Sequence, residues 1–360
     1  MKSYNCSDFT KLGNEIARLF QFAERDSFFS LPGWYALVAD RGLDREWRAG
    51  LSVGDDAQVA LVWCHNRDKS PRALRSCTNA YTCEYDVLHG GSNLDTVRAF
   101  AKNLVLDNPQ RDYIRLEGLD PAKPEFAAVI DGFRAGDWVV KPYFGWGSWF
   151  EMTNGLDFAS YLAARPTILQ NTWKRKSSAL KNSARSAIRF YSKGDDLAYF
   201  IDAYELVQSQ SWKQPEPFRK FVPGLIRLAA ENDALRLGVL EIDGRPAAAQ
   251  IWIVWAGNVT IFKLVHAEEF AVFSPGTVLS MQMMQTVLES DRPNEINFGR
   301  GDDAYKKLWL SSRRERWGIE AANPRTLRGL SPAGKLALGL GRDRLKKMLG
   351  QSRGVGASAR

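Results

Sequence analysis

Three apolar segments in the second half of the chain constrain the fold more than any other feature. They run over residues 235–242, 247–255 and 259–265 and are rich in leucine, isoleucine, valine and tryptophan. An Asp-Gly pair at 243–244 and a Gly-Asn pair at 257–258 separate them, and both pairs are typical of tight hairpin turns. The pattern predicts an antiparallel meander of three strands.

Helical and strand patterns surround this meander. A Ser-Pro-Gly sequence at 274–276 is suited to open a helix, because proline is favoured at the first helical position. The elements that we predict, in chain order, are a strand at 195–200, helices at 201–212 and 217–231, the meander, a helix at 277–288, a strand at 295–298, a short helix at 302–310 and a strand at 316–320.

The first half of the chain also alternates helices and strands, which predicts βαβ units around a central sheet. The chain has 360 residues, 45% of them hydrophobic. This length favours two domains over one. We predict an α/β or α+β protein with domains at 1–155 and 195–323, a basic linker helix at 156–194 and a basic tail at 324–360.

The net positive charge of the chain lies in that tail. From residue 324 onward there are nine basic residues and one acidic residue, which accounts for the whole net charge of +8. The rest of the chain is therefore neutral. The tail also carries leucines at helical spacing and ends in a Gly/Ser-rich stretch. It is either a solvated tail or an amphipathic helix that attaches to an anionic membrane surface or a nucleic acid.

A second basic stretch, residues 173–193, contains seven basic residues and no acidic residue. Pro166 is well placed to open a helix that carries most of it. Two interpretations remain open at this point. The stretch is either a linker helix with a solvated basic face or an electrostatic guide for an acidic or phosphorylated substrate.

The cysteines and the N-terminus favour an intracellular protein without a metal site. Cys6 and Cys64 stand alone, and Cys77 and Cys83 lack the further close-spaced ligands of a zinc site. Reduced core cysteines are the simpler interpretation. The first residues lack the basic and then apolar pattern of a signal peptide, and no run of about 18 apolar residues is present. We therefore expect a cytoplasmic protein with no transmembrane helix.

The order helix, helix, meander, helix, strand, helix, strand resembles the core of the GNAT superfamily of acyltransferases. Four segments are also similar to bacterial CelD-like acetyltransferases, often labelled cellulose-biosynthesis or BioF-like. They are Leu31-Pro32-Gly33-Trp34, Leu162 to Leu169 with Lys174-Arg175-Lys176, Ser274-Pro275-Gly276-x-x-Leu279, and Phe298-Gly299-Arg300-Gly301-Asp302-x-x-Tyr305-Lys306-x-x-Trp309. The resemblance implies tandem GNAT-like domains, each a mixed, largely antiparallel sheet flanked by helices. Fem-type aminoacyltransferases, which use aminoacyl-tRNA, share this architecture.

The resemblance also implies a donor site at the start of the helix after the meander. Amide groups at a helix N-terminus attract an anion such as the pyrophosphate of acyl-CoA. Gly276 allows close approach of the backbone. The candidate cofactor-binding residues are Ser274, Gly276, Thr277, Val278 and Lys306. Typical GNAT loops carry a second spaced small residue, and this chain departs from that pattern.

Acyl transfer to an amine needs a base for the amine and benefits from an acid for the leaving thiolate. Tyr305 stands where the superfamily's general-acid tyrosine is expected. His266 ends the third meander strand, and its ordinary pKa suits a base near neutral pH. Glu241 ends the first meander strand, where some GNAT enzymes keep a base. Each of these residues also has an ordinary structural interpretation at its position.

Three functional hypotheses follow. The first is an N-acyltransferase that moves an acyl group, acetyl in the simplest case, from acyl-CoA to an amine acceptor. The resemblance implies a saccharide or other small-molecule acceptor in envelope polysaccharide biosynthesis. The second is a Fem-like transferase that uses aminoacyl-tRNA, the one case in which a nucleic acid would be a partner. The third is a non-catalytic GNAT-fold scaffold that docks through the basic tail.

Overall fold

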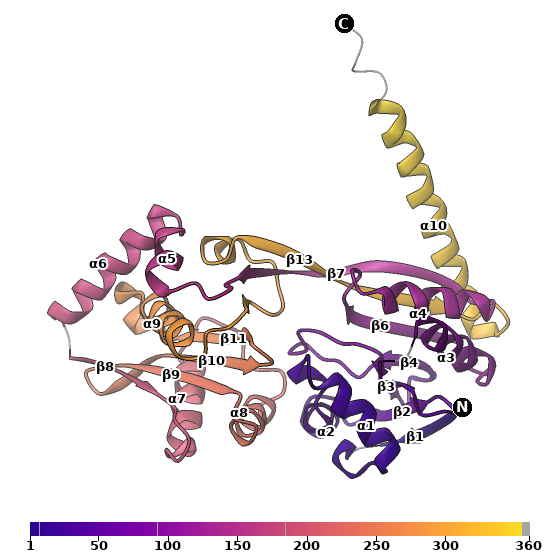
Figure 1. The fold of residues 1–360 in the computed structure, drawn as a ribbon, viewed down its shortest axis with the longest axis horizontal. Helices are drawn as coiled ribbons and strands as arrows, with labels where there is room; N and C mark the ends of the chain where they lie inside the picture. The colour runs from indigo at the N-terminus through magenta and orange to yellow at the C-terminus, as the bar shows by residue number, and fades with distance from the viewer. Residues whose placement is uncertain (7, 92, 184, 355–360) are drawn as a thin grey trace, which may run out of the picture. The chain divides into compact units, whose positions relative to one another are not determined.

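The computed structural model describes residues 1–6, 8–91, 93–183 and 185–354, and it divides into two compact units. The first unit contains Met1–Glu24, Phe29–Trp146 and the chain from Glu315 onward. The second unit contains Arg25–Phe28 and Gly147–Arg314. Figure 1 labels most of the helices and strands of the two units. Each unit groups stretches of the chain that contact one another, and these stretches are not continuous in sequence. The domain boundaries proposed from sequence therefore stay a prediction.

The first unit is a mixed sheet with helices beside it. The strand order is β1-β2-β3-β4-β6-β13, with β5 paired to β3. All described pairs within this set are antiparallel except β4 with β6, which is parallel. The strands are β1 (Lys2–Asn5), β2 (Trp47–Val53), β3 (Val59–Asn66), β4 (Ser70–Ser76), β5 (Leu88–His89), β6 (Tyr113–Leu119) and β13 (Ser312–Ala322).

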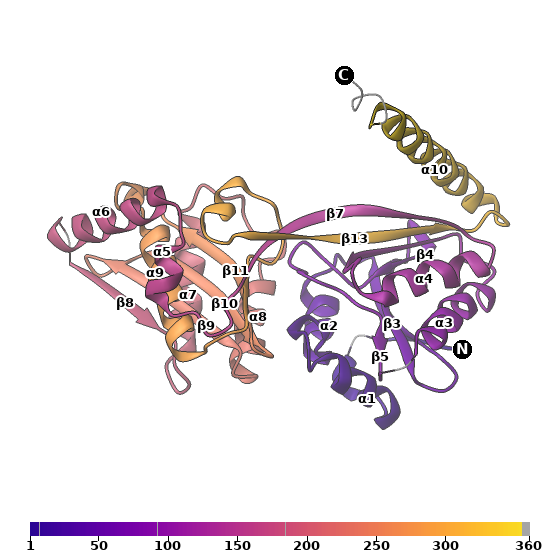
Figure 2. The same ribbon diagram turned by 45° about the horizontal axis from the view of Figure 1, so that its top comes forward.

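Four helices of the first unit carry apolar faces that pack within it. They are α1 (Asn14–Ala23), α2 (Pro32–Arg41), α3 (Leu94–Leu106) and α4 (Pro124–Ala135). Gly132 lets α4 approach α3 closely, because a Cβ atom at this position would lie 2.4 Å from the carbonyl oxygen of Arg98. Figure 2 shows α3 and α4 side by side along the sheet. The predicted alternation of helices and strands in the first half is therefore confirmed.

The second unit contains the predicted meander. The strand order is β7-β12-β11-β10-β9-β8. The antiparallel run is β8 (Ser186–Phe190), β9 (Leu235–Ile242), β10 (Arg245–Trp255) and β11 (Asn258–His266). A parallel partner, β12 (Glu295–Asn297), follows and pairs in turn with the end of β7 (Val139–Met152). The mixed, largely antiparallel sheet with flanking helices confirms the predicted fold class.

One predicted strand is wrong. Residues 195–200 enter helix α7 (Leu197–Ser209), which Asp196 caps by accepting a hydrogen bond from the amide of Ala198. The first strand of the antiparallel run is instead β8, inside the segment assigned to a linker helix. Its partner, β9, lies some fifty residues further along the chain. The local sequence pattern could not reveal this long-range pairing, because apolar and polar residues alternate only weakly along a short edge strand.

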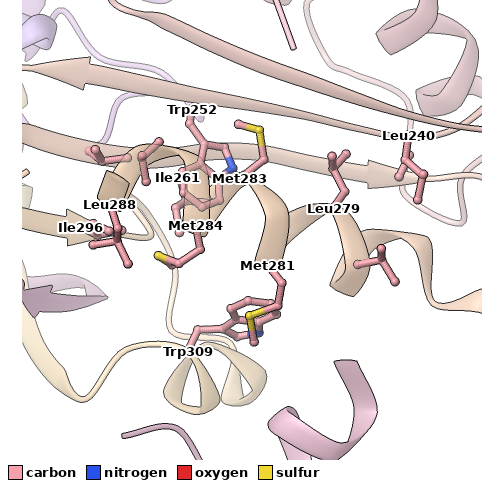
Figure 3. Close-up of a cluster of buried hydrophobic side chains, with 14 of the residues drawn as sticks. Leu240, Trp252, Ile261, Leu279, Met281, Met283, Met284, Leu288, Ile296 and Trp309 are labelled. Carbon is pink, nitrogen blue, oxygen red and sulfur yellow. The ribbon is translucent and has the colours of Figure 1, made fainter. Parts of the chain in front are cut away.

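Helices cover both faces of the second sheet (Figure 1). Helices α7 and α8 (Phe221–Glu231) lie on one face, and α5 (Phe158–Ala163), α6 (Thr167–Ser183) and α9 (Pro275–Ser290) lie on the other. Leu169 and Leu180 of α6 belong to the same buried cluster as the apolar face of α9. Figure 3 shows part of this cluster, with methionines of α9 between Trp252 and Trp309. The basic helix is therefore built into the second unit rather than spanning a gap.

The C-terminal segment begins as a packed helix. Helix α10 (Leu327–Gly354) buries Ala333 and Leu336 against Ala322, with Tyr113 and Val139 beside them. Further along α10, Asp343 forms an ion pair of 2.8 Å with Lys141. Within the described residues, no helix is both long and apolar enough to cross a membrane. The Gly/Ser-rich end at 355–360 lies outside the described residues.

Candidate active site

The candidate site of the second unit lies where the parallel strands β11 and β12 separate. Strands β11 and β12 pair only through Asn258–Thr260 and Glu295–Asn297. Beyond this short ladder lies a cavity of about 410 Å³, lined by the end of β11, the start of α9, the 3-10 helix η4 (Ala304–Leu308) and the loop after α7. The sequence predicted a longer helix at 302–310 in place of η4. The separation of the strands exposes part of the β11 backbone to this cavity.

The start of α9 faces the cavity with little side-chain cover. Ser274 precedes the helix in the left-handed conformation, with φ of 50°, and Pro275 opens the first turn. The amides of Thr277 and Val278 both donate to the carbonyl of Ser274. Among the described residues, the Gly276 amide has no acceptor, so it is the group at this helix start that a ligand can use. Val278 points into the core and does not line the cavity.

The fold itself has room for a side chain at Gly276. A Cβ atom there would lie 3.5 Å from Nδ1 of His266, which is ordinary van der Waals contact. Packing within the protein therefore does not require glycine at this position. The absent side chain instead leaves the backbone open toward His266 and the cavity. This arrangement suits close approach of a ligand to the helix start.

Gln250 holds the first turn of α9 in place. Its side chain is fully buried in β10, and its amide nitrogen donates to the carbonyl of Gly276 at 2.9 Å and to the hydroxyl of Ser280 at 2.8 Å. Its amide oxygen accepts a hydrogen bond from the indole of Trp252. Both the amide nitrogen and the amide oxygen of Gln250 have hydrogen-bond partners, so this side chain fixes the helix start relative to the meander.

His266 and Lys213 lie together at the end of β11. The Lys213 ammonium donates a hydrogen bond of 2.5 Å to the carbonyl oxygen of Leu264. Partial burial and the charge of Lys263 lower the pKa of Lys213. Partial burial and the positive charge of Lys213 lower the pKa of His266 as well. The imidazole is therefore neutral near pH 7 and able to accept a proton.

Tyr305 lines the cavity from η4 and is 46% exposed. Burial among its neighbours and the negative charge of Asp303 raise the pKa of Tyr305 to about 12, so its hydroxyl stays protonated. Lys306 has a different place. Its ammonium donates to the carbonyls of Arg300 and Gly301 at 2.9 and 3.1 Å and pairs with Asp303 at 2.9 Å. These bonds close the glycine-rich turn, and Lys306 does not line the cavity.

Glu241 lies elsewhere on the sheet. It accepts hydrogen bonds from the hydroxyl of Tyr199 at 2.5 Å and from Arg189 at 3.1 Å. Burial raises its pKa, and these two hydrogen bonds outweigh that effect and lower it. Glu241 is thus a bound carboxylate outside the cavity. The structure brings together His266, Ser274, Gly276, Thr277 and Tyr305 from the set of candidates named from sequence, and it leaves Glu241, Val278 and Lys306 outside.

Sequence reasoning missed several residues of the cavity, among them Trp212, Lys213 and Gln250. Lys213 and Trp212 lie in the loop after α7, and nothing in the local pattern distinguished that loop. Gln250 did leave a signal, because it is the one polar side chain in the apolar run 247–255. A polar residue in such a run needs a buried partner. Among the described residues, no group of three or more histidine, cysteine or acidic side chains is arranged to hold a metal ion.

Comparisons with known proteins agree with this architecture. Residues 169–307 match the protein-family model described as "Acetyltransferase (GNAT) domain". A search of curated proteins found no match to the sequence.

Three solved structures are similar over most of the chain. FemX superposes with a TM-score of 0.60 at 10% identity, covering 89% of this chain and 97% of that one. The L-PGS of Bacillus licheniformis superposes with a TM-score of 0.55 at 10% identity, covering 95% and 99%. A tandem GNAT protein from the clavulanic acid biosynthesis pathway gives 0.51 at 11% identity, covering 89% and 98%. At these identities the likeness concerns the fold. Residues 169–307 match a GNAT acetyltransferase domain, which supports a transferase, and the three solved structures share the fold of the chain.

Proposed function

We propose that the second unit transfers an acyl group from acyl-CoA to an amine by direct attack. The observation that carries this proposal is the separation of β11 from β12 beside the open start of α9. A thioester lying in this cavity would have a strand backbone on one side and helix amides at its end. Both are fixed donors, which is what stabilisation of a developing oxyanion needs.

The backbone of Leu264 supplies the donor for the thioester carbonyl in this proposal. Within an extended strand, the N–H and C=O groups of one residue point to the same edge. The Leu264 carbonyl is bound by Lys213, which lines the cavity, so the Leu264 amide faces the same side. Its hydrogen bond would polarise the carbonyl and strengthen as negative charge develops on the oxygen.

His266 and Tyr305 are the groups suited to move protons. The amine nitrogen would attack the carbonyl carbon as its proton passes to the neutral imidazole of His266. The new C–N bond forms, the C–S bond breaks, and the hydroxyl of Tyr305 donates a proton to the departing thiolate. The raised pKa of Tyr305, about 12, keeps that proton available at neutral pH.

The basic stretch on α6 supports binding of the donor's phosphates. Lys176 donates a hydrogen bond of 2.5 Å to the carbonyl of Val272, two residues before Ser274. This contact brings one cation of the stretch to the loop that opens α9. With the free Gly276 amide, it favours an anion at this point. The electrostatic interpretation of the stretch is therefore the one that we retain.

The acceptor rests on the CelD-like resemblance. We propose an amine on a sugar or a related precursor of envelope polysaccharide, acted on in the cytoplasm. The similarity to FemX and to a lysylphosphatidylglycerol synthetase over most of the chain favours one alternative, a transferase that takes an aminoacyl group from aminoacyl-tRNA. That alternative predicts donor binding that weakens steeply with salt, since phosphate contacts dominate the binding of nucleic acids.

Isothermal titration with acetyl-CoA, a longer acyl-CoA and free CoA tests the proposal. Gly276→Trp would fill the helix start and should abolish binding. Gly341→Trp is the matched control, because that helical glycine has no atom within 4 Å of its added Cβ and lies in α10. Loss of binding only in Gly276→Trp supports the donor site. No binding of any of the three ligands to the unaltered protein would reject acyl-CoA as donor and favour the alternative, or the scaffold hypothesis if aminoacyl-tRNA also fails to bind.

A further inference from the structure

A second cavity lies in the first unit, and it includes residues of the segment assigned from sequence to the basic tail. It has a volume of about 490 Å³ and surrounds the N-terminal ends of the parallel strands β4 and β6. The start of β2, the turn between β3 and β4, and the first turns of α10 complete its walls. The donor cavity of the second unit instead lies beyond the C-terminal end of β11. The two cavities belong to different units and different ends of their sheets.

Five basic side chains line this second cavity from separate parts of the chain. They are Lys69, Arg72, Arg75, Arg328 and Lys335. Within the described part of the chain, none of the five has an ion-pair partner. Two acidic residues also line the cavity. Glu320 is already engaged, since it accepts a hydrogen bond from the hydroxyl of Tyr113 at 2.5 Å and pairs with Arg115.

The other acid, Asp112, is buried, and its Oδ1 atom has no hydrogen-bond partner. Two negative charges against five positive charges leave an excess of three. Like charges that converge on one cavity repel each other unless a counter-ion is present. All five cationic side chains are exposed, so solvent screens part of their repulsion, and the remaining excess of positive charge favours an anion in the cavity.

The walls are held firmly enough to form a site. Gly329 lets the start of α10 approach closely, because a Cβ atom there would lie 2.1 Å from the carbonyl oxygen of Asn323. The Asn323 side chain donates at 3.0 Å to the carbonyls of both Pro109 and Arg111, just before β6. Leu336 is buried one turn beyond the cavity's Pro332. These contacts place Arg328 and Lys335 beside the strand ends.

Apolar and aromatic surface adjoins the cations. Trp47 and Leu336 both line the cavity, and the guanidinium of Arg75 lies 5.1 Å from the centre of the Trp47 ring. A bare inorganic ion would leave this surface unused. A ligand with a phosphate group and a short carbon portion would use both parts, because arginine pairs well with phosphate oxygens while the carbon portion contacts the ring.

We propose that this cavity binds a phosphate ester, with Arg72, Arg75 and Arg328 around the phosphate and Trp47 against the carbon portion. The ester could be a soluble metabolite or the glycerol phosphate headgroup of an anionic lipid, since the recognised chemistry is the same. Neither source depends on the acyl-transfer function proposed for the second unit.

Two binding measurements distinguish the sources. Isothermal titration with glycerol 3-phosphate, and with uncharged glycerol as control ligand, tests the soluble source. Cosedimentation with phosphatidylcholine vesicles, with and without phosphatidylglycerol, tests the lipid source. Arg72→Glu/Arg328→Glu should weaken whichever binding occurs at least tenfold. Arg18→Glu/Lys102→Glu makes the same charge change on exposed helix positions of the same unit and should change it less than twofold.

The variant Arg72→Gln/Arg328→Gln removes the two charges without reversing them, so it keeps the test valid if the reversed charges impair folding. It should cause a smaller but clear loss of binding. Binding of glycerol 3-phosphate that the cavity variants lose supports the soluble source. Binding confined to phosphatidylglycerol vesicles, and lost in the same variants, supports the lipid source. Absence of both forms of binding, or equal loss in the cavity and control variants, would overturn the proposal.

Discussion

The ammonium group of Lys213 donates a hydrogen bond of 2.5 Å to the carbonyl oxygen of Leu264, on the part of β11 that no longer pairs with β12. This contact replaces the strand partner that the sheet lacks there. It fixes the strand edge on which the proposed oxyanion contact depends. It also sets a positive charge near His266, whose pKa it helps to lower.

Lys213→Met should therefore change both rate and pH dependence. Loss of the strand contact should lower kcat/KM about tenfold, equivalent to ~1.4 kcal/mol. Removing the positive charge favours the imidazolium form, so the pKa of His266 should rise. The acidic limb of the kcat/KM profile should then move to higher pH. Lys220→Met, at the exposed start of α8, is the control. An unchanged acidic limb in Lys213→Met would rule out this coupling.

The two bases named from sequence can be separated by matched substitutions. His266→Gln should lower kcat by about a hundredfold or more while acyl-CoA still binds, because general-base catalysis contributes on this scale. Glu241→Gln should leave kcat within a factor of about two, since Glu241 is bound to Tyr199 and Arg189 outside the cavity. Steady-state kinetics with titration of the donor measures both. The opposite ranking would transfer the role of base to Glu241.

Tyr305→Phe should lower kcat by about tenfold or more if its hydroxyl protonates the thiolate. The phenylalanine ring keeps its packing against Phe298, whose ring centre lies 6.0 Å away. Tyr199→Phe is the control, because Tyr199 also has a pKa near 12 and a strong hydrogen bond but lies outside the cavity. A donor with a more acidic thiol leaving group should reduce the effect of Tyr305→Phe. Equal rates for both variants would leave Tyr305 without a catalytic role.

Arg165 should matter for stability rather than for chemistry. Its side chain is only 3% exposed, pairs with Glu151 at 3.1 Å and donates to the carbonyl of Trp309 at 2.6 Å. Arg165→Met leaves the Glu151 carboxylate largely buried without its partner, so the free energy of unfolding should fall by about 3 to 5 kcal/mol. Arg189 offers the control, because its side chain is 59% exposed although it pairs with Glu241, and Arg189→Met should cost under about 1 kcal/mol.

Urea unfolding of these two arginine variants provides the measurement. Combining Arg165→Met with Glu151→Leu should recover part of the loss, because the uncompensated charge is then removed. If Arg165→Met is no more destabilising than Arg189→Met, the buried pair does not hold this region together. The presence of Arg165 in the segment from Leu162 to Leu169, which carried part of the CelD-like resemblance, would then need another structural explanation.

The meander shows what local sequence can determine. Strand β9 was predicted to the residue, and β10 and β11 within two residues at each end. Apolar runs with hairpin pairs between them carry strong local signals, since the turns need residues that accept a positive φ. Asp243, Gly244 and Gly257 all adopt one. The short edge strand β8 had no such signal.

The loop residues of the candidate site could be predicted from sequence, but the residues from distant parts of the chain that contact them could not. His266 and the Ser274–Thr277 turn were found because each ends or opens an element, where backbone groups are left unpaired. Lys213 contacts a carbonyl that lies 51 residues away in the chain. Lys306 resembled a ligand-binding residue in sequence, and the folded turn engages its ammonium with the carbonyls of Arg300 and Gly301.

Local sequence was enough to predict the order of elements from α7 to β12 and the helix start that faces the proposed donor. Both depend on hydrophobic period, turn residues and caps, which act over a few residues. Local sequence gave no sign that β11 separates from β12, that α6 packs on α9, or that cations from β4 and α10 line one cavity. Those features depend on contacts between distant segments, and no local pattern records which segments will meet.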